Sequence, residues 1–318
     1  MAKQVEPYKC TLTLSNEILT LAADASYQIG RLSVLSEHGQ EEEELASCVK
    51  YALMDEGILL TPSQYRGLKL GEDLEKVPEA SGLLKLYKKY TRGEAITEKT
   101  LREYEEALFP NGVPVRMSRR VEGFPYPIPM HARVPSLMDG LLRFGASKKV
   151  HPLSRAVLFY FMIYALAPYS RLNGPLAKLL FKAMLSSYSK DLAALPLEEM
   201  IHHRKKEVDA AYEKAVNEGD VAPFLSYMLR LITLAVTKKG KEAVRQENGS
   251  TPLVDKLTAL MEEGRFYSAQ ELCDLLKLKS RLGLSKNYLR PALSGKKIIM
   301  SNPLCPTDRN QRYAKASQ

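Results

Sequence analysis

Apolar residues return at helical spacing along most of the chain. Over 14–35 they recur every three or four positions, which predicts a helix that Ser15 can cap. The acids at 41–44 suit the positive end of a second helix, which should end near Gly57. A loop-rich stretch is expected from there to about Leu83. Further helices are predicted at 84–90, 98–108, 134–144, 151–166, 197–217 and 223–237, with another opened by Pro175.

The longest apolar run covers 156–168 and is too short for a membrane span, which needs about 20 residues. It is better interpreted as a helix buried on all sides at the centre of a domain. The first eleven residues are polar and lack the apolar core of a signal peptide. We therefore expect a mostly α, cytoplasmic protein with no membrane partner.

Two stretches interrupt the helical pattern. Five prolines and two glycines lie within 109–129, and the segment between them predicts a short β-hairpin or flap at the surface. The polar stretch 238–250 is the best linker candidate. These boundaries predict three parts: an N-terminal helical region at 1–110, a core at 111–240 and a small domain at 251–318.

Charge is distributed unevenly. The chain carries a net charge of +9, and 277–318 alone holds ten Lys or Arg and one acid, so the preceding residues sum to zero. A basic C-terminal end favours an acidic partner, most simply double-stranded DNA, although a solvated basic tail remains the alternative. The four cysteines form no C-x-x-C pair, so reduced thiols are expected rather than a disulfide framework or a zinc site.

The loop 168–174 lies between the buried helix and the next helix. Amide groups at the start of that next helix point into the loop, which makes it a candidate anion site. The stretch 151–180 resembles the core of the Fic family, with Pro168, Tyr169, Asn173 and Gly174 in register with its motif H-P-F-x-[DE]-G-N-G-R-x-x-R. Members of this family typically transfer AMP from ATP to a protein hydroxyl. The resemblance implies a Fic-type helical core with a β-hairpin flap.

Five motif positions differ from the family pattern. Ala167 stands at the catalytic histidine, Arg171 at the magnesium-binding acid, Leu172 at the first loop glycine, and Pro175 and Lys178 at the two arginines. A methyl group cannot accept a proton, and a guanidinium cannot hold a divalent cation. The side chain of Leu172 should also keep phosphate away from the backbone. We therefore expect no catalytic residue and no metal site.

The same loop keeps a set of candidate ligands for phosphate. Arg171, Asn173, Gly174 and Lys178 could hold ATP or another phosphate ligand without magnesium, although an ordinary surface salt bridge is the alternative for the two basic residues. The stretch 52–57 also resembles the inhibitory helix motif [ST]-x-x-x-E-[GN] of many Fic proteins. This likeness implies that Glu56 reaches Lys178 and blocks the site. A plain helix end capped by Gly57 is the other interpretation.

The C-terminal part has the layout of a winged helix: three short helices followed by a hairpin. Ser268 and Glu271 form a capping box for the second helix, and the third is expected at 284–293, although Pro291 lies inside it. The candidate DNA-binding residues are basic or amide side chains of this third helix and of the segments after it: Lys286, Asn287, Arg290, Lys296, Lys297, Arg309 and Arg312.

Other histidines are weaker candidates. His202 and the Glu199–His203 pair could face a metal, but a solvated helix face fits their basic neighbours better. His151 should cap the start of the buried helix. The sequence favours a regulatory protein with a degenerate Fic-type site. The alternatives are an atypical adenylyltransferase and a scaffold whose flap, at 113–121, binds a protein target by strand addition.

Overall fold

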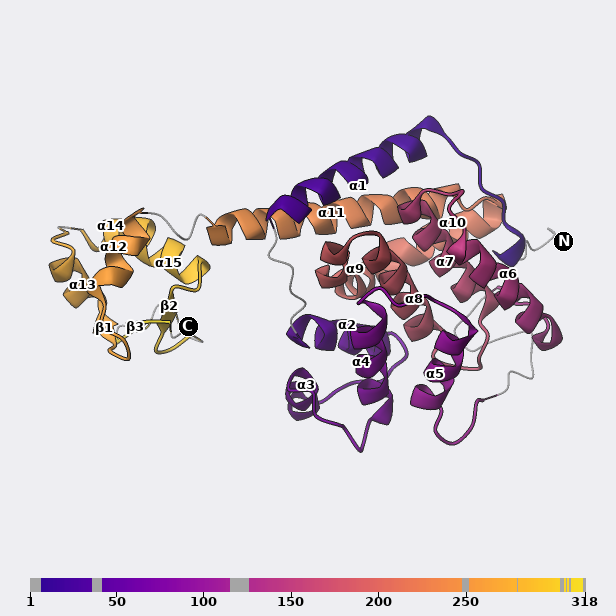
Figure 1. Ribbon diagram of the computed structural model, residues 1–318, viewed down its shortest axis with the longest axis horizontal. Coiled ribbons are helices and arrows are strands. Elements are labelled where there is room, and N and C mark those ends of the chain that lie inside the picture. Colours follow the sequence, from indigo (N-terminus) through magenta and orange to yellow (C-terminus); the bar gives the residue numbers. More distant parts are fainter. Residues whose placement is uncertain are drawn as a thin grey trace. The chain divides into compact units, whose positions relative to one another are not determined.

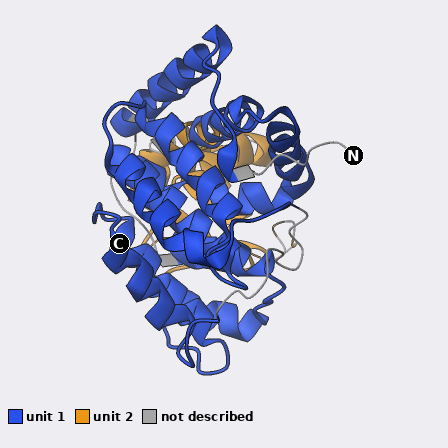
Figure 2. Ribbon diagram, turned by 90° about the vertical axis from the view of Figure 1, so that its right-hand side faces the viewer, with its two compact units in different colours: residues 1–237 blue, residues 238–318 orange. Residues whose placement is uncertain are grey.

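The computed structural model divides the chain into two compact units, Met1–Thr237 and Lys238–Gln318 (Figures 1 and 2). The described residues are 7–35, 42–114, 126–247, 252–278, 280–303, 306, 308 and 310–316. Most of the expected flap and Arg309 lie outside them. No helix in the described ranges is both long and apolar enough to span a bilayer.

The first unit is helical throughout its described length. Its elements are η1 (Pro7–Lys9), α1 (Asn16–Leu35), α2 (Glu42–Met54), α3 (Pro62–Lys69), α4 (Pro78–Tyr90), α5 (Glu98–Leu108), η2 (His131–Arg133), α6 (Val134–Ala146), α7 (Pro152–Leu166), α8 (Asn173–Tyr188), η3 (Lys190–Ala194), α9 (Leu197–His203), α10 (Lys205–Glu218) and α11 (Ala222–Glu247). The prediction of a mostly α fold is confirmed.

One prediction along this unit is wrong. The stretch expected to be loop-rich contains α3 and the start of α4, and Thr61 caps α3 through a capping box with Gln64. α3 buries few side chains, so its sequence carried little apolar periodicity, and the capping signal was the better guide. The boundary between the two units falls at 237/238, at the start of the expected linker at 238–250, and α11 continues into that stretch as far as Glu247.

α7 is the centre of the first unit, as its apolar run predicts. Nearly all its side chains are buried, and it packs most extensively against α8. Aromatic rings fill the space between α7 and the later helices: the rings of Phe161 and Tyr212 lie 4.6 Å apart between centroids, and Phe224 stacks beside Tyr160. This packing fixes the end of α7 and the start of α8, and so positions the loop 168–174 between them.

The second unit combines short helices with a small sheet. Its elements are α12 (Pro252–Leu260), β1 (Tyr267–Ser268), α13 (Ala269–Leu275), α14 (Arg281–Leu284), the π-helical turn η4 (Ser285–Leu289), α15 (Arg290–Ser294), β2 (Ile298–Met300) and β3 (Arg312–Lys315). The strand order is β1-β3-β2 and both pairings are antiparallel, with Tyr313 opposite Tyr267 on one side and Met300 on the other. The predicted capping box of Ser268 and Glu271 is confirmed.

The expected helix at 284–293 is divided into three parts around a proline. Pro291 lies in the first turn of α15, where the missing N–H matters least. The wider π-helical turn η4 precedes it and leaves room for the proline ring, which would clash with the carbonyl one turn earlier in a regular helix. The chain therefore accommodates the proline by changing helix type rather than by ending the helix.

Candidate functional site

The loop between α7 and α8 turns on two residues with left-handed backbone. Ala167 has φ of +40° directly after α7, and Leu172 has φ of +62° directly before α8. Such values are unusual for residues with a side chain and are typical of functional loops held by their surroundings. The phenol of Tyr104 donates to the Leu172 carbonyl over 2.7 Å, which helps to hold the second turn.

The side chain of Asn173 shapes the loop from within. Its amide nitrogen donates to the Tyr169 carbonyl over 2.9 Å, and its carbonyl oxygen accepts from the Tyr169 N–H over 3.0 Å. Both polar atoms of this buried amide are therefore used by the loop backbone. Asn173 holds the loop in shape and keeps the amide groups at the start of α8 exposed to an anion.

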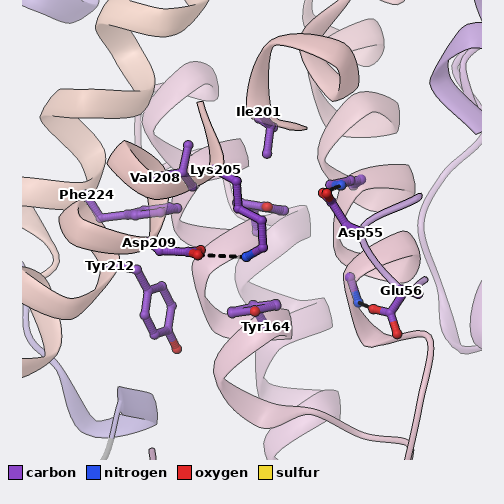
Figure 3. Close-up of a pocket in the computed structure, with 12 residues that line it drawn as sticks. Asp55, Glu56, Tyr164, Ile201, Lys205, Val208, Asp209, Tyr212 and Phe224 are labelled. Carbon is purple, nitrogen blue, oxygen red and sulfur yellow. Dashed lines mark hydrogen bonds and ion pairs between the residues drawn. The ribbon is translucent and has the colours of Figure 1, made fainter. Parts of the chain in front are cut away.

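The carboxylate of Glu56 accepts hydrogen bonds from those amide groups. Its two oxygens lie 3.0 Å from the Leu172 nitrogen and 3.1 Å from the Gly174 nitrogen. Figure 3 shows the Glu56 side chain and its bond to Gly174. A Cβ at Gly174 would lie 2.8 Å from the Glu56 carboxylate, so only glycine permits this approach. The first turn of α8 is thus an anion site that the chain fills with its own side chain.

This arrangement corrects the expectation for Leu172. Its side chain was expected to keep anions from the backbone, yet it is only 1% exposed and packs into the core. The left-handed turn directs the side chain inward and leaves the N–H free to bond a carboxylate. A leucine at this position is therefore compatible with anion binding.

Lys178 pairs with Asp55 rather than with Glu56, so the predicted contact between Glu56 and Lys178 is wrong. Lys178 is 3% exposed and donates to the carboxylate of Asp55, which also bonds Nδ1 of His202 at 2.6 Å. Burial alone would raise the pKa of Asp55, but Lys178 and His202 outweigh it and hold that pKa below its usual value. Glu56 and Asp55 follow α2 in the chain, so this pairing anchors the segment that carries Glu56.

Arg171 lies farther out than the other candidates. Its guanidinium is 3.6 Å from a Glu79 oxygen and lies over the ring of Phe109, 5.6 Å from the centroid. Its side chain is half exposed. The salt bridge that the sequence left as an alternative is therefore present, and a phosphate at this loop would have to compete with Glu79 for Arg171.

A small cavity opens beside the loop, between α7, α8 and α10 (Figure 3). Its volume is about 60 Å³, well below the roughly 300 Å³ at which small-molecule sites begin. Tyrosine and acidic side chains line it, among them Tyr164, Asp55, Glu56 and Asp209. Lys205 closes one side and pairs with Asp209 over 2.7 Å. A nucleotide would have to displace some of these groups.

The other histidine candidates, His151, His202 and His203, have different bonding partners. Among the described residues no group of three or more potential ligands comes together. His203 only approaches Glu199, at 3.7 Å. His151 occupies the capping position of α7, but its side chain makes no capping bond and lies 3.3 Å from the Ser26 hydroxyl. His202, which sequence reasoning set aside, belongs to the site through Asp55.

Comparison with known proteins agrees with this geometry. Residues 252–314 match the family described as "Filamentation induced by cAMP protein Fic-like, C-terminal domain". The crystal structure of a Fic family protein from Desulfovibrio desulfuricans G20 covers 98% of this chain and 99% of its own, with 24% identity and a TM-score of 0.63. The chain thus shares the fold of a Fic family protein along nearly its whole length, and its C-terminal part matches a Fic-like domain family.

A second solved structure shares the fold over a smaller part of the chain. It is a Fic domain containing signaling protein from Bacteroides thetaiotaomicron VPI-5482, which covers 70% of this chain and 98% of its own length, with 14% identity and a TM-score of 0.53. None of the curated proteins compared with the chain matches it. The resemblance seen at the central loop is therefore supported by the fold as a whole.

Replacing Asp55 by Asn should make the free energy of unfolding depend less on pH in the acid range. The pKa of Asp55 is lower in the folded than in the unfolded state, so its stabilisation is present above about pH 4 and is lost as the pH falls through the folded pKa. Removing one partner of this charge-assisted network should cost about 2 kcal/mol at pH 7. Urea unfolding of the wild type and the variant in the same buffers, between pH 2.5 and 7, measures the difference in their free energy of unfolding.

Asp139→Asn is the matched control, because Asp139 pairs with Arg143 on the surface and should contribute less than about 0.5 kcal/mol. The wild type and Asp55→Asn curves should converge at the acid end. Parallel curves across the whole range would contradict the assignment of Asp55.

Proposed function

We propose that this chain is a Fic-family regulator that does not transfer AMP. Its central loop exchanges Glu56 for an anionic ligand. Its C-terminal unit binds double-stranded DNA. The observation that carries the first part is the identity of the loop residues. Ala167 occupies the position of the motif histidine and Arg171 that of the motif acid. General base and metal ligand are both absent from the motif, which leaves a binding loop.

Anion binding is supported by the contacts of Glu56. A carboxylate already sits on the Leu172 and Gly174 amides, and a phosphate oxygen could make the same bonds. Arg171 lies close to the loop and could add a charge-assisted bond once released from Glu79. Lys178 pairs with Asp55, so it supports the site indirectly, by anchoring the segment that carries Glu56. ATP or another phosphate compound, bound without magnesium, suits this arrangement.

DNA binding is supported by the surface of the second unit. Lys286, Asn287 and Arg290 are all exposed along η4 and α15, while Tyr288 and Leu289 between them are buried. An exposed asparagine among cations on a helix can bond the edge of adenine in the major groove. The order helix, strand, helices and hairpin, with β3 central in the sheet, supports a winged-helix arrangement.

Further basic residues flank that surface. Lys296 and Lys297 are exposed between α15 and β2, and Arg312 is exposed on β3. These positions suit phosphate contacts beside a recognition helix. Arg309 lies outside the described residues and stays a prediction from the sequence, as does a protein target at the flap, 113–121.

A second function is favoured by one contact. His202 bonds Asp55, which lines the cavity beside the loop, so an imidazole lies near the place where a base would be needed. An atypical adenylyltransferase could use it in place of the motif histidine. Incubation of the full chain with ATP labelled in its α-phosphate and a cell lysate tests this alternative.

If the protein is a regulator that does not transfer AMP, the wild type should give no labelled protein product. Label that appears with the wild type and is lost in His202→Ala would establish the enzyme instead. His203→Ala is the matched control, because His203 adjoins His202 but contacts only the exposed Glu199.

Replacing Glu56 by Ala should strengthen anion binding at the loop. The change vacates two amide donors and removes a carboxylate held by charge-assisted bonds worth about 1.5–3 kcal/mol, so pyrophosphate and ATP should bind roughly 10- to 100-fold more tightly. Isothermal titration without magnesium measures both ligands. Glu79→Ala serves as control, because it frees Arg171 and leaves the amides occupied. Equal affinity in wild type and Glu56→Ala would refute the exchange.

Replacing Lys286 and Arg290 together by Ala should weaken binding to duplex DNA. If each contacts one phosphate, the slope of log K against log salt should fall in magnitude by about two. Fluorescence anisotropy of the full chain with labelled duplex, between about 50 and 200 mM salt, measures that slope. Lys85→Ala/Lys99→Ala, which removes two exposed charges of the first unit, is the control for net charge. An unchanged slope in the double variant would contradict this surface.

A further inference from the structure

Helix α1 has two apolar faces, and only one of them is buried against the described residues of the first unit. The inward face is buried in the core through five residues at helical spacing: Ile18, Ala22, Ala25, Ile29 and Leu32. At its start, α1 is tied to α11 by the ion pair of Glu17 with Arg230. The helix lies along the outside of the first unit in both views (Figures 1 and 2). Its position is therefore fixed without help from the outer face.

The outer face forms an apolar stripe, which we define as Leu19, Ala23, Tyr27, Gly30 and Val34. At 100° per residue these five positions fall within a sector of about 80°, directed away from the buried face. Leu19, Tyr27 and Val34 are 57%, 65% and 84% exposed. Single exposed apolar side chains are ordinary, but a stripe that runs the length of a helix marks a contact surface.

Gly30 points to the kind of contact. Glycine inside a helix costs about 1 kcal/mol relative to alanine, so a reason for it is expected. A Cβ built at Gly30 meets nothing within 4 Å, so the fold of one chain does not require glycine there. A glycine on an exposed apolar stripe lets another backbone approach closely. The occupant of this face is therefore expected to be a helix packed tightly against it.

We propose that this helix is α1 of a second copy, packed antiparallel across a twofold axis. An axis that passes between Ser26 and Tyr27 sets Leu19 opposite the partner's Val34, and sets Ala23 opposite the partner's Gly30. The stripe is thus complementary to itself: large residues face each other at its two ends, small residues face each other inside them, and Tyr27 lies beside the axis. Self-complementarity of one patch is what a twofold dimer needs.

The charges beside the stripe support the antiparallel direction. Asp24 and Arg31 lie one heptad apart on the same edge of the stripe, and Asp24 has no salt-bridge partner among the described residues. Arg31 makes only a cation–π contact with Tyr27 in the part of the chain that the structure describes. In the antiparallel pair Asp24 lies near the partner's Arg31, and the twofold axis repeats this contact. A parallel pair would instead set this edge of the stripe against the opposite edge of the partner's stripe, so Asp24 and the partner's Arg31 would not meet.

Charge reversal with rescue tests both the surface and the partner. Sedimentation equilibrium of the full chain at low salt should show a dimer that dissociates on dilution. Asp24→Arg and Arg31→Asp should each weaken it by about tenfold or more, because each turns two attractive contacts into repulsive ones. The double variant Asp24→Arg/Arg31→Asp should recover the wild-type constant, which only antiparallel contact between copies predicts.

A second variant removes the apolar contact without touching the core. Leu19→Ser/Val34→Ser should be monomeric at every concentration, while its thermal unfolding at high dilution matches the wild type, because both side chains are exposed. A wild type that stays monomeric up to about 100 times the concentration used for circular dichroism would overturn the proposal. So would a dimer that is unchanged in this variant, or one that the double charge reversal fails to restore.

Discussion

The free amide groups at the start of α8 are the constraint on which the central site depends. They carry the positive end of a helix dipole into a buried loop and need an acceptor. The Glu56 carboxylate supplies it for Leu172 and Gly174, and the absence of a side chain at Gly174 makes the approach possible. Any ligand of this loop meets an internal competitor already held by two bonds.

Buried charge explains why the surroundings of α8 are so fixed. Two lysines of this helix point inward, and each must be paired because an isolated ammonium in the core is very costly. Lys178 is paired with Asp55, and Lys182, which is fully buried, lies 2.9 Å from a Glu198 oxygen. The phenol of Tyr87 donates to the other oxygen of Glu198. Segments from α2, α4 and α9 are thereby tied to one helix, so Glu56 is held in place from several sides.

Local patterns in the sequence were enough to predict much of the fold. The helices α1 and α5 have clear apolar periodicity, α7 is a continuous apolar run, and α5 covers the predicted residues from Glu98 to Leu108. α3 was missed because it buries little, although Thr61 and Gln64 carried a capping signal. The turn type around Pro291 could not be predicted, because a proline specifies that the helix must adjust and not how it adjusts.

The contacts of the site were harder to predict than the residues. Motif register brought attention to Asn173, Gly174, Lys178 and Glu56, and all four lie at the same loop. Which of two successive acids reaches Lys178 depends on how the chain leaves α2, where a turn places Asp55 on one side and Glu56 on the other. The bond from His202 to Asp55 joins residues 147 positions apart, so no local pattern could reveal it.

The left-handed turn at Leu172 has a consequence for how such a protein changes over evolutionary time. The Fic motif has glycine at this position, the residue that adopts a positive φ without strain, yet here a leucine adopts it and buries its side chain. The path of the backbone is thus set by the packing around the loop and by Asn173. Single substitutions at this loop could therefore add or remove a chemical activity while the fold stays the same.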